Sequence, residues 1–97
     1  ANTIRFKDLV IDKKGREVRI NETKIELTKS EFDILLLLAE NLNIVFSREK
    51  ILDRIRADEL ELSDRIIDYQ ISGLRKKIKP YSEYIKTVRG IGYKFKT

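Results

Sequence analysis

The chain has 97 residues, of which 41% are hydrophobic and 38% charged, and 21 Lys and Arg against 16 Asp and Glu give it a formal net charge of +5 at pH 7. This length and balance predict one folded domain over residues 1–97, and no apolar run approaches the roughly 18 residues of a membrane span. The absence of cysteine excludes disulfides and thiolate metal sites, and the absence of histidine removes the commonest general base, so we expect no catalytic residue, no metal and no cofactor.

Residues 1–27 are predicted to form an antiparallel sheet of short strands. Apolar and charged residues alternate between Ile4 and Leu27, and the pattern is interrupted at Lys14-Gly15 and at Asn21-Glu22. Period-two alternation broken by Gly and Asn is typical of a meander with one buried face. Nothing in this segment suggests a reactive site.

Two helices are expected next. Thr28-Lys29-Ser30-Glu31 is a capping box, and the apolar face behind it is wide enough to be buried on more than one side, so we expect a central core helix. Ser47 is expected to N-cap a short helix over about residues 48–56, with Val45-Phe46 as a hydrophobic staple. The acidic segment 57–62 then joins this helix to the next.

A third helix is predicted over residues 64–79. Its apolar residues fall on one stripe, Ser63 suits the N-cap, and Pro80 ends the helix. The opposite face has cations at both ends and small or planar groups between them: Arg65, Tyr69, Ser72, Gly73, Lys76 and Lys79. We interpret this face as one that enters the major groove of DNA, although a solvated basic face explains the helix alone equally well.

Residues 84–97 are predicted to form a β-hairpin. Gly90 and Gly92 are expected to supply the positive φ angles of a tight turn, which places Arg89 at the tip. A long cation on a narrow ribbon suits a minor groove. The alternative is a surface hairpin with an exposed arginine.

Charge is distributed unevenly along the chain. Residues 1–64 hold 12 Lys and Arg against 14 Asp and Glu, a balance of −2, whereas residues 65–97 hold 9 against 2, a balance of +7. Such asymmetry is the usual pattern of a surface that binds a polyanion. An anionic membrane would satisfy the same charge, but the basic segment lacks the Trp-, Phe- and Leu-rich face that inserts into a bilayer.

Four motifs carry a resemblance to a known family. They are Leu27-Thr28-x-x-Glu31-Phe32-x-x-Leu35, Ser47-Arg48-Glu49-x-x-Leu52, Asp64-Arg65-x-x-Asp68-x-x-Ile71-x-x-Leu74-Arg75-x-Lys77 and Thr87-Val88-Arg89-Gly90-x-Gly92-Tyr93-x-Phe95. In order and spacing the chain resembles the C-terminal effector domain of OmpR/PhoB-type two-component response regulators. The resemblance implies an α+β winged helix-turn-helix, with an N-terminal antiparallel sheet, a three-helix core and a C-terminal β-hairpin wing.

The resemblance also implies a function: a bacterial, cytoplasmic transcription factor that binds double-stranded promoter DNA sequence-specifically. The full-length protein would carry an upstream receiver domain, phosphorylated by a cognate histidine kinase, and the effector domains would be monomers in isolation and dimers on tandem half-sites. By motif position it implies phosphate contacts from Arg48, Arg56, Arg65 and Thr87, a recognition face of Tyr69, Ser72, Gly73 and Lys76, and Arg89 in the minor groove. It further implies a loop that contacts RNA polymerase: Ala57, Asp58, Glu59, Leu60, Glu61 and Leu62.

Gly73 departs from the family pattern, because many members have a base-reading arginine there. We therefore expect fewer base hydrogen bonds from this helix, unless Gly73 lets the backbone approach the groove closely. Tyr69 suits packing against a thymine methyl or a bond to phosphate, and the alternative is a partly buried surface tyrosine with no role in binding. The alternative function is a winged-helix protein-interaction module with weak or non-specific DNA binding, for which Gly73 is the best support. RNA is disfavoured because the aromatic residues form no exposed stacking row.

Overall fold

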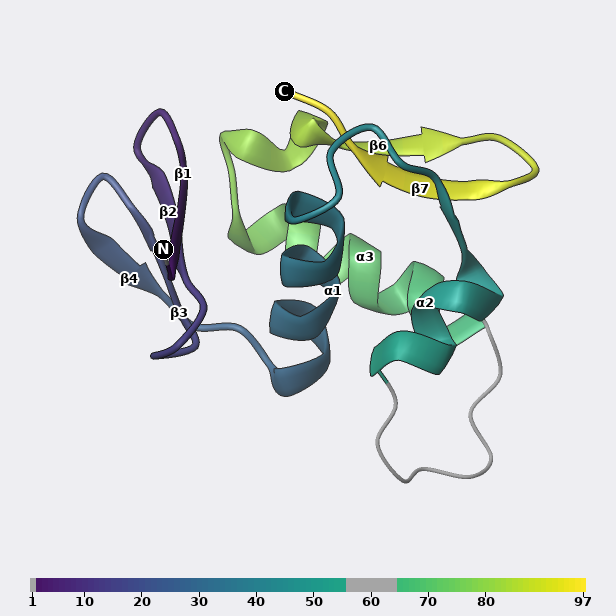
Figure 1. Ribbon diagram of the computed structural model, residues 1–97, viewed down its shortest axis with the longest axis horizontal. Helices are drawn as coiled ribbons and strands as arrows, with labels where there is room; N and C mark the ends of the chain where they lie inside the picture. The colour runs from purple at the N-terminus through teal and green to yellow at the C-terminus, as the bar shows by residue number, and fades with distance from the viewer. Residues whose placement is uncertain (1, 56–64) are drawn as a thin grey trace.

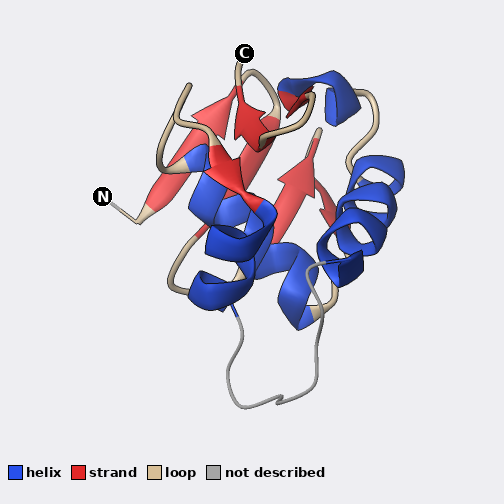
Figure 2. Cartoon of the chain, turned by 90° about the vertical axis from the view of Figure 1, so that its right-hand side faces the viewer, coloured by secondary structure: helices blue, strands red, loops and turns tan. Residues whose placement is uncertain are grey.

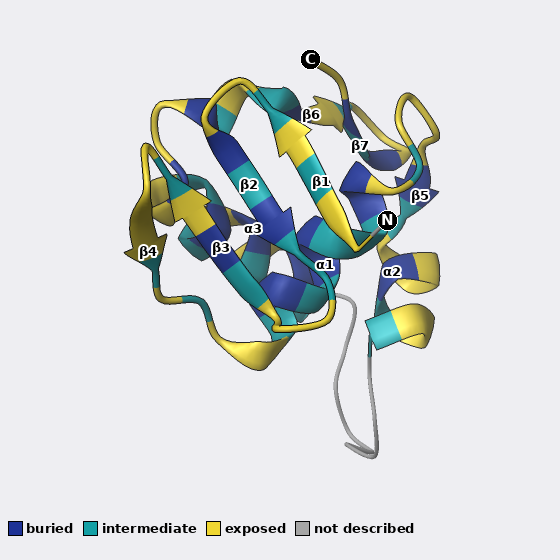
Figure 3. Cartoon of the chain, turned by 60° about the vertical axis from the view of Figure 1, so that its left-hand side comes forward, coloured by how far each residue is buried: buried dark blue, intermediate teal, exposed yellow. Residues whose placement is uncertain are grey.

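Four short antiparallel strands come first in the chain: β1 (Thr3–Phe6), β2 (Leu9–Asp12), β3 (Glu17–Ile20) and β4 (Thr23–Ile25), paired in that order. The computed structural model describes residues 2–55 and 65–97. Asn21 and Glu22 join β3 to β4 with φ angles of 50° and 70°, which is the turn that matches the twist of a two-residue hairpin. The predicted meander with one buried face is confirmed, and Figure 3 shows buried and intermediate residues alternating along β2 and exposed and intermediate residues alternating along β1.

Helix α1 (Lys29–Ala39) begins at the predicted capping box. The Glu31 N–H donates to Thr28 Oγ1 at 3.1 Å, and the Thr28 N–H donates to Glu31 Oε1 at 2.9 Å. The helix lies between the N-terminal sheet and the other two helices (Figure 1), and its residues Ile34, Leu35 and Leu38 are fully buried. The prediction of a central core helix is therefore confirmed.

Helices α2 (Arg48–Ile55) and α3 (Arg65–Lys77) complete the bundle. Ser47 caps α2 as predicted, because its Oγ accepts the Lys50 N–H at 3.1 Å. Helix α3 ends three residues before Pro80, and a single 3-10 turn, η1 (Tyr81–Tyr84), which the apolar pattern did not predict, leads into the hairpin. The predicted N-cap Ser63 lies outside the described residues.

The C-terminal hairpin consists of β6 (Ile85–Val88) and β7 (Gly92–Phe95), which we call the wing. A two-residue strand, β5 (Phe46–Ser47), pairs with β7, so the sheet order is β5-β7-β6. The interpretation of Val45-Phe46 as a helix staple was therefore incomplete: Phe46 is a strand residue opposite Tyr93. Viewed from the wing end, the helices lie in front of the N-terminal sheet (Figure 2).

The two predicted turn glycines of the wing have different roles. Gly90 has a φ of 77°, as expected, and no atom lies within 4 Å of the position of a Cβ. Gly92 does not have a positive φ, which corrects its prediction. Its backbone lies so close to β5 that a Cβ would overlap the carbonyl oxygen of Phe46 and lie 2.8 Å from the Ser47 Cα. Glycine is needed there for close strand approach.

Candidate nucleic-acid interface

Helix α3 presents three different faces. The first is the predicted apolar stripe of Ile67, Ile71, Leu74 and Ile78, which is buried in the core. The second is exposed and polar, and Tyr69, Ser72 and Lys76 lie on it, with Tyr69 76% exposed. Arg65 is exposed at the first residue of the helix. The third face is turned toward the wing and was not singled out in the sequence: it carries Asp68 and Arg75, seven residues and so about two turns apart.

Gly73 does not lie on the exposed face, which corrects its predicted position. It is half-buried, and a Cβ built on it would lie 2.6 Å from Oε2 of Glu31 on α1. The Glu31 carboxylate of α1 thus packs against the α3 backbone at this point. Glycine at position 73 therefore serves helix packing, and the expected close approach to a groove is no longer needed to explain it.

Glu31 is a buried carboxylate with two roles. Besides capping α1, its Oε1 accepts a hydrogen bond from Lys77 Nζ at 2.7 Å, which ties the start of α1 to the last turn of α3. Burial by itself raises the pKa of Glu31, but the hydrogen bonds from Lys77 and the Thr28 N–H favour the charged form more strongly. The net effect is a pKa below the usual value, and the pair fixes α3 against the core.

Arg75 joins α3 to both strands of the wing. Its Nη2 donates to the Ile85 carbonyl oxygen at 2.6 Å and to Thr87 Oγ1 at 2.9 Å, and its guanidinium lies 5.6 Å from the centroid of the Tyr93 ring. Thr87, for which a phosphate contact is predicted, is thus an acceptor for Arg75 and keeps its own hydroxyl hydrogen for another partner. The sequence held one signal for this contact with the wing. Within the α3 motif, Arg75 follows Asp68 by seven residues, which places both side chains on the same face of the helix.

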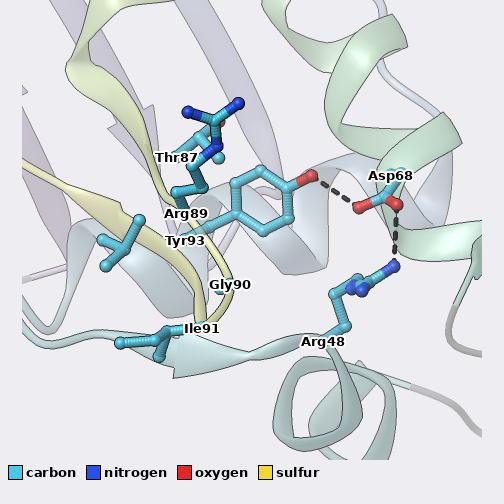
Figure 4. Close-up of a pocket in the computed structure, with 9 residues that line it drawn as sticks. Arg48, Asp68, Thr87, Arg89, Gly90, Ile91 and Tyr93 are labelled. Carbon is cyan, nitrogen blue, oxygen red and sulfur yellow. Dashed lines mark hydrogen bonds and ion pairs between the residues drawn. The ribbon is translucent and has the colours of Figure 1, made fainter.

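Asp68 joins three elements through its two carboxylate oxygens, as Figure 4 shows. Oδ1 accepts the Tyr93 hydroxyl on β7 at 2.5 Å, and Oδ2 accepts Arg48 Nη1, at the start of α2, at 3.0 Å. Burial and the hydrogen bond to Asp68 raise the pKa of Tyr93 to about 12, so its hydroxyl remains a donor at neutral pH. Arg48, expected to contact phosphate, is therefore held as an ion pair in the free protein.

These residues border a pocket of about 210 Å³ between the wing, α2 and α3, lined among others by Arg48, Asp68, Thr87 and Arg89. Arg89 lies in the turn of the wing, as predicted, and is exposed, next to Ile91, which is 61% exposed. Arg48, Thr87 and Arg89 thus meet at one site, while Tyr69, Ser72 and Lys76 lie on the neighbouring face of α3. Arg56 and the segment from Ala57 to Leu62 lie outside the described residues.

In residues 2–55 and 65–97 no group of three or more acidic side chains is arranged to hold a metal ion. None of the described helices has the length and apolar character needed to span a membrane.

Comparison with known proteins adds three relatives. Response regulator ArlR of Staphylococcus aureus is 46% identical over 87 residues, which are 88% of this chain and 40% of that protein. The structure of DrrB, an OmpR/PhoB homologue from Thermotoga maritima, matches with a TM-score of 0.88 and 40% identity over 99% of this chain and 45% of that one. The RstA DNA-binding domain of Klebsiella pneumoniae, solved in complex with the RstA box, matches with a TM-score of 0.84 and 34% identity over 99% of this chain and 98% of that domain.

The order of elements, with an N-terminal sheet, three helices and a hairpin wing, is that of a winged helix-turn-helix of the OmpR/PhoB type. The chain spans less than half the length of the curated relative named above. A family model described as "Transcriptional regulatory protein, C terminal" matches residues 22–95, from β3–β4 through the wing. This chain therefore belongs to the family of C-terminal domains of transcriptional regulatory proteins.

Proposed function

We propose that this chain binds double-stranded DNA sequence-specifically, as the output domain of a bacterial response regulator. The observation that carries the proposal is that Arg75 and Asp68 hold the wing against α3, so that a polar helix face and a cationic hairpin tip are presented together. Family membership and the RstA domain solved with its DNA box support the same activity. We infer a binding role without catalysis.

The exposed face of α3 enters the major groove in this proposal. The short Ser72 hydroxyl and the long Lys76 ammonium group can donate hydrogen bonds to base edges or phosphates. The flat Tyr69 ring can pack against a thymine methyl. Base edges in the major groove carry the sequence information, whereas phosphate contacts fix the position of the protein on the duplex. Arg89 at the wing tip enters the adjacent minor groove, where a narrow A·T-rich segment attracts a guanidinium.

Phosphate contacts come from residues around these two elements. Arg48 and Thr87 line the pocket between the wing and α2, and Arg65 lies at the start of α3. Arg56 is proposed as a fourth phosphate contact on the family resemblance alone. The cationic phosphate contacts, together with the formal charge of +7 on residues 65–97, supply most of the affinity and make it depend on salt.

The longer protein implied by the relatives is also a proposal. It would add an upstream receiver domain, phosphorylated by a cognate histidine kinase in the cytoplasm, and phosphorylation would pair two effector domains on tandem half-sites. The chain by itself would be a monomer. The segment from Ala57 to Leu62 is proposed, from the resemblance, to contact RNA polymerase.

The protein-interaction alternative has lost its main support. It rested on glycine at position 73 replacing a base-reading side chain on the exposed face. Gly73 faces Glu31 on α1, so its identity says nothing about how the exposed face is used.

A selection from a library of random duplexes tests the proposal. The chain is expected to enrich a defined sequence and to bind it at least roughly a thousandfold more tightly than a scrambled duplex of the same composition. The logarithm of the binding constant should fall linearly with the logarithm of salt concentration, with a slope near −0.9 for each phosphate contact. If no sequence is enriched and both duplexes bind equally, the proposal is wrong.

A further inference from the structure

Asp68 is the single acidic residue in helix α3, whose sequence from Arg65 to Lys77 otherwise contains only neutral and basic side chains. Its side chain is 48% exposed, beside the face proposed to meet DNA. A carboxylate at that place repels phosphate and so lowers the affinity for every duplex. Its presence on a DNA-facing helix therefore needs an explanation.

Stability is a poor explanation for the contact with Arg48. The two side chains are 48% and 44% exposed, and ion pairs between such exposed groups contribute little to folding. The contact does change the positive charge available to DNA, because the Arg48 guanidinium is paired with the Asp68 carboxylate when no phosphate is near. The same carboxylate fixes the wing, through Tyr93, at a set position beside α3.

We propose that Asp68 is a specificity-determining positioning residue, which raises discrimination between DNA sequences at the expense of affinity for any duplex. It acts in two ways, and the inference rests on the DNA-binding function proposed above. By pairing with Arg48 it withholds one cation from phosphate binding on any duplex. By holding Tyr93 it keeps the wing and α3 in one register, so that only a site with the correct spacing of grooves engages both.

The two actions affect different quantities: the pairing with Arg48 sets the affinity for any duplex, and the position of the wing sets discrimination between duplexes. Non-specific binding depends on the number of cations that reach phosphates, whereas a specific complex also needs base-edge and minor-groove contacts at fixed relative positions. Releasing Arg48 strengthens both kinds of complex, because its phosphate contact does not depend on sequence. Loosening the wing weakens only the second kind. The ratio of specific to non-specific affinity therefore falls whenever Asp68 is neutralised.

The first experiment compares the wild-type chain with Asp68→Asn on two duplexes, the one enriched from the random library and its scrambled version. Asparagine loses the charge that holds Arg48, and its neutral amide oxygen holds the Tyr93 hydroxyl more weakly than a carboxylate does, so the wing is loosened as well. The variant is expected to bind the scrambled duplex several-fold more tightly, with a salt slope steeper by about 0.9, and to discriminate roughly tenfold less. Glu26→Gln, the same charge change on an 85% exposed side chain after β4, is the matched control and should leave the ratio unchanged.

A second experiment repeats the Asp68 substitution in chains that lack the Arg48 cation, to test whether Arg48 is responsible for the change in affinity. In Arg48→Gln chains, adding Asp68→Asn is expected to give less than half of the gain in affinity for the scrambled duplex, because the released cation is no longer there. Tyr93→Phe keeps both charges and removes only the hydroxyl, so it should lower discrimination without changing the salt slope. Circular dichroism of each variant is the control that checks whether the fold is retained.

The outcomes separate this inference from the function on which it rests. If the wild-type chain does not distinguish the two duplexes, the proposed function fails. If the wild-type chain distinguishes them and Asp68→Asn distinguishes them equally well, only the inference is overturned. A proportional loss of affinity for both duplexes also overturns it, since that is what a purely structural role of Asp68 produces.

Discussion

Glu31 and Gly73 show how single residues fix the position of α3. The Glu31 side chain is only 5% exposed, and it is bonded at once to the Thr28 backbone and to Lys77. Glycine at position 73 leaves the space that the carboxylate fills. The position of α3 against α1 is therefore set by one charged group and by the absence of one methyl group.

Gly73→Ala is expected to gain no stability, although alanine in a helix interior normally gains about 1 kcal/mol over glycine. The new Cβ must displace Glu31 Oε2, which strains the capping box and the Lys77 contact. In a Glu31→Ala background the same substitution should recover the gain of about 1 kcal/mol, because nothing then occupies the space. Urea unfolding of the four chains measures this coupling, and additive effects would contradict it.

Glu31→Gln is expected to destabilise the fold by about 1–3 kcal/mol at neutral pH, because Lys77 loses a charged acceptor. The pKa of Glu31 is lowered by folding, so its contribution is complete above the unfolded value near 4.5 and is lost as pH falls through the lower folded value. The difference between the two chains should therefore vanish at a pH well below 4.5. Urea unfolding across acid pH tests this, with the exposed Glu26→Gln as a control that should change nothing.

Among single residues, the sequence predicted the contacts between residues that are close together in the chain. The Thr28-x-x-Glu31 bonds span three residues and follow from the capping-box pattern. The Glu31–Lys77 bond joins positions 46 residues apart, and no local pattern reports it. Gly73 was placed on the wrong face for the same reason, since only the packed helices show which side of it is occupied.

Among the helices and strands, too, local patterns predicted each element but not the contacts between elements that are distant in the chain. Its strands and turn follow from alternation and glycine positions, and α1, α2 and α3 from helical spacing, all within one segment of chain. The pairing of β5 with β7 brings Ser47 opposite Gly92, and a strand of two residues has no periodicity to detect. The strand immediately before α2 is therefore part of the same sheet as the wing, and Arg48, the next residue, pairs with Asp68.

Substitution of the two wing glycines should separate their roles. Gly92→Ala is expected to be destabilising by several kcal/mol, because a Cβ overlaps the Phe46 carbonyl and separates β5 from β7. Gly90→Ala meets no atom and is strained only by its φ of 77°, for about 1–2 kcal/mol. Thermal unfolding measures both. A smaller loss for Gly92→Ala than for Gly90→Ala would mean that the strand approach is not tight.

Across the whole molecule, charge is segregated. The N-terminal sheet and the wing lie at opposite ends (Figure 1), and the basic residues 65–97 form α3 and the wing. This segregation was visible in the sequence, and the structure adds that one face of α3 and the wing tip are tied together by Asp68 and Arg75. A polyanion is thus attracted to α3 and the wing, and the position of a cation should matter more than how many cations the chain carries.

Arg89→Ala and Lys14→Ala test this, since each removes one positive charge from an exposed turn, the first in the wing and the second between β2 and β3. Arg89→Ala is expected to weaken binding to the enriched duplex at least about tenfold and to reduce the preference for A·T pairs where the wing lies, because a guanidinium in a narrow minor groove is lost. Lys14→Ala should change affinity less than about twofold, since its charge lies on the N-terminal sheet, at the end opposite the wing, and salt screens the interaction of distant exposed charges. Binding titrations on the enriched duplex and on one with G·C pairs substituted at the wing position measure both effects. Equal losses for the two variants would mean that net charge alone drives binding and that the wing has no specific place in a groove.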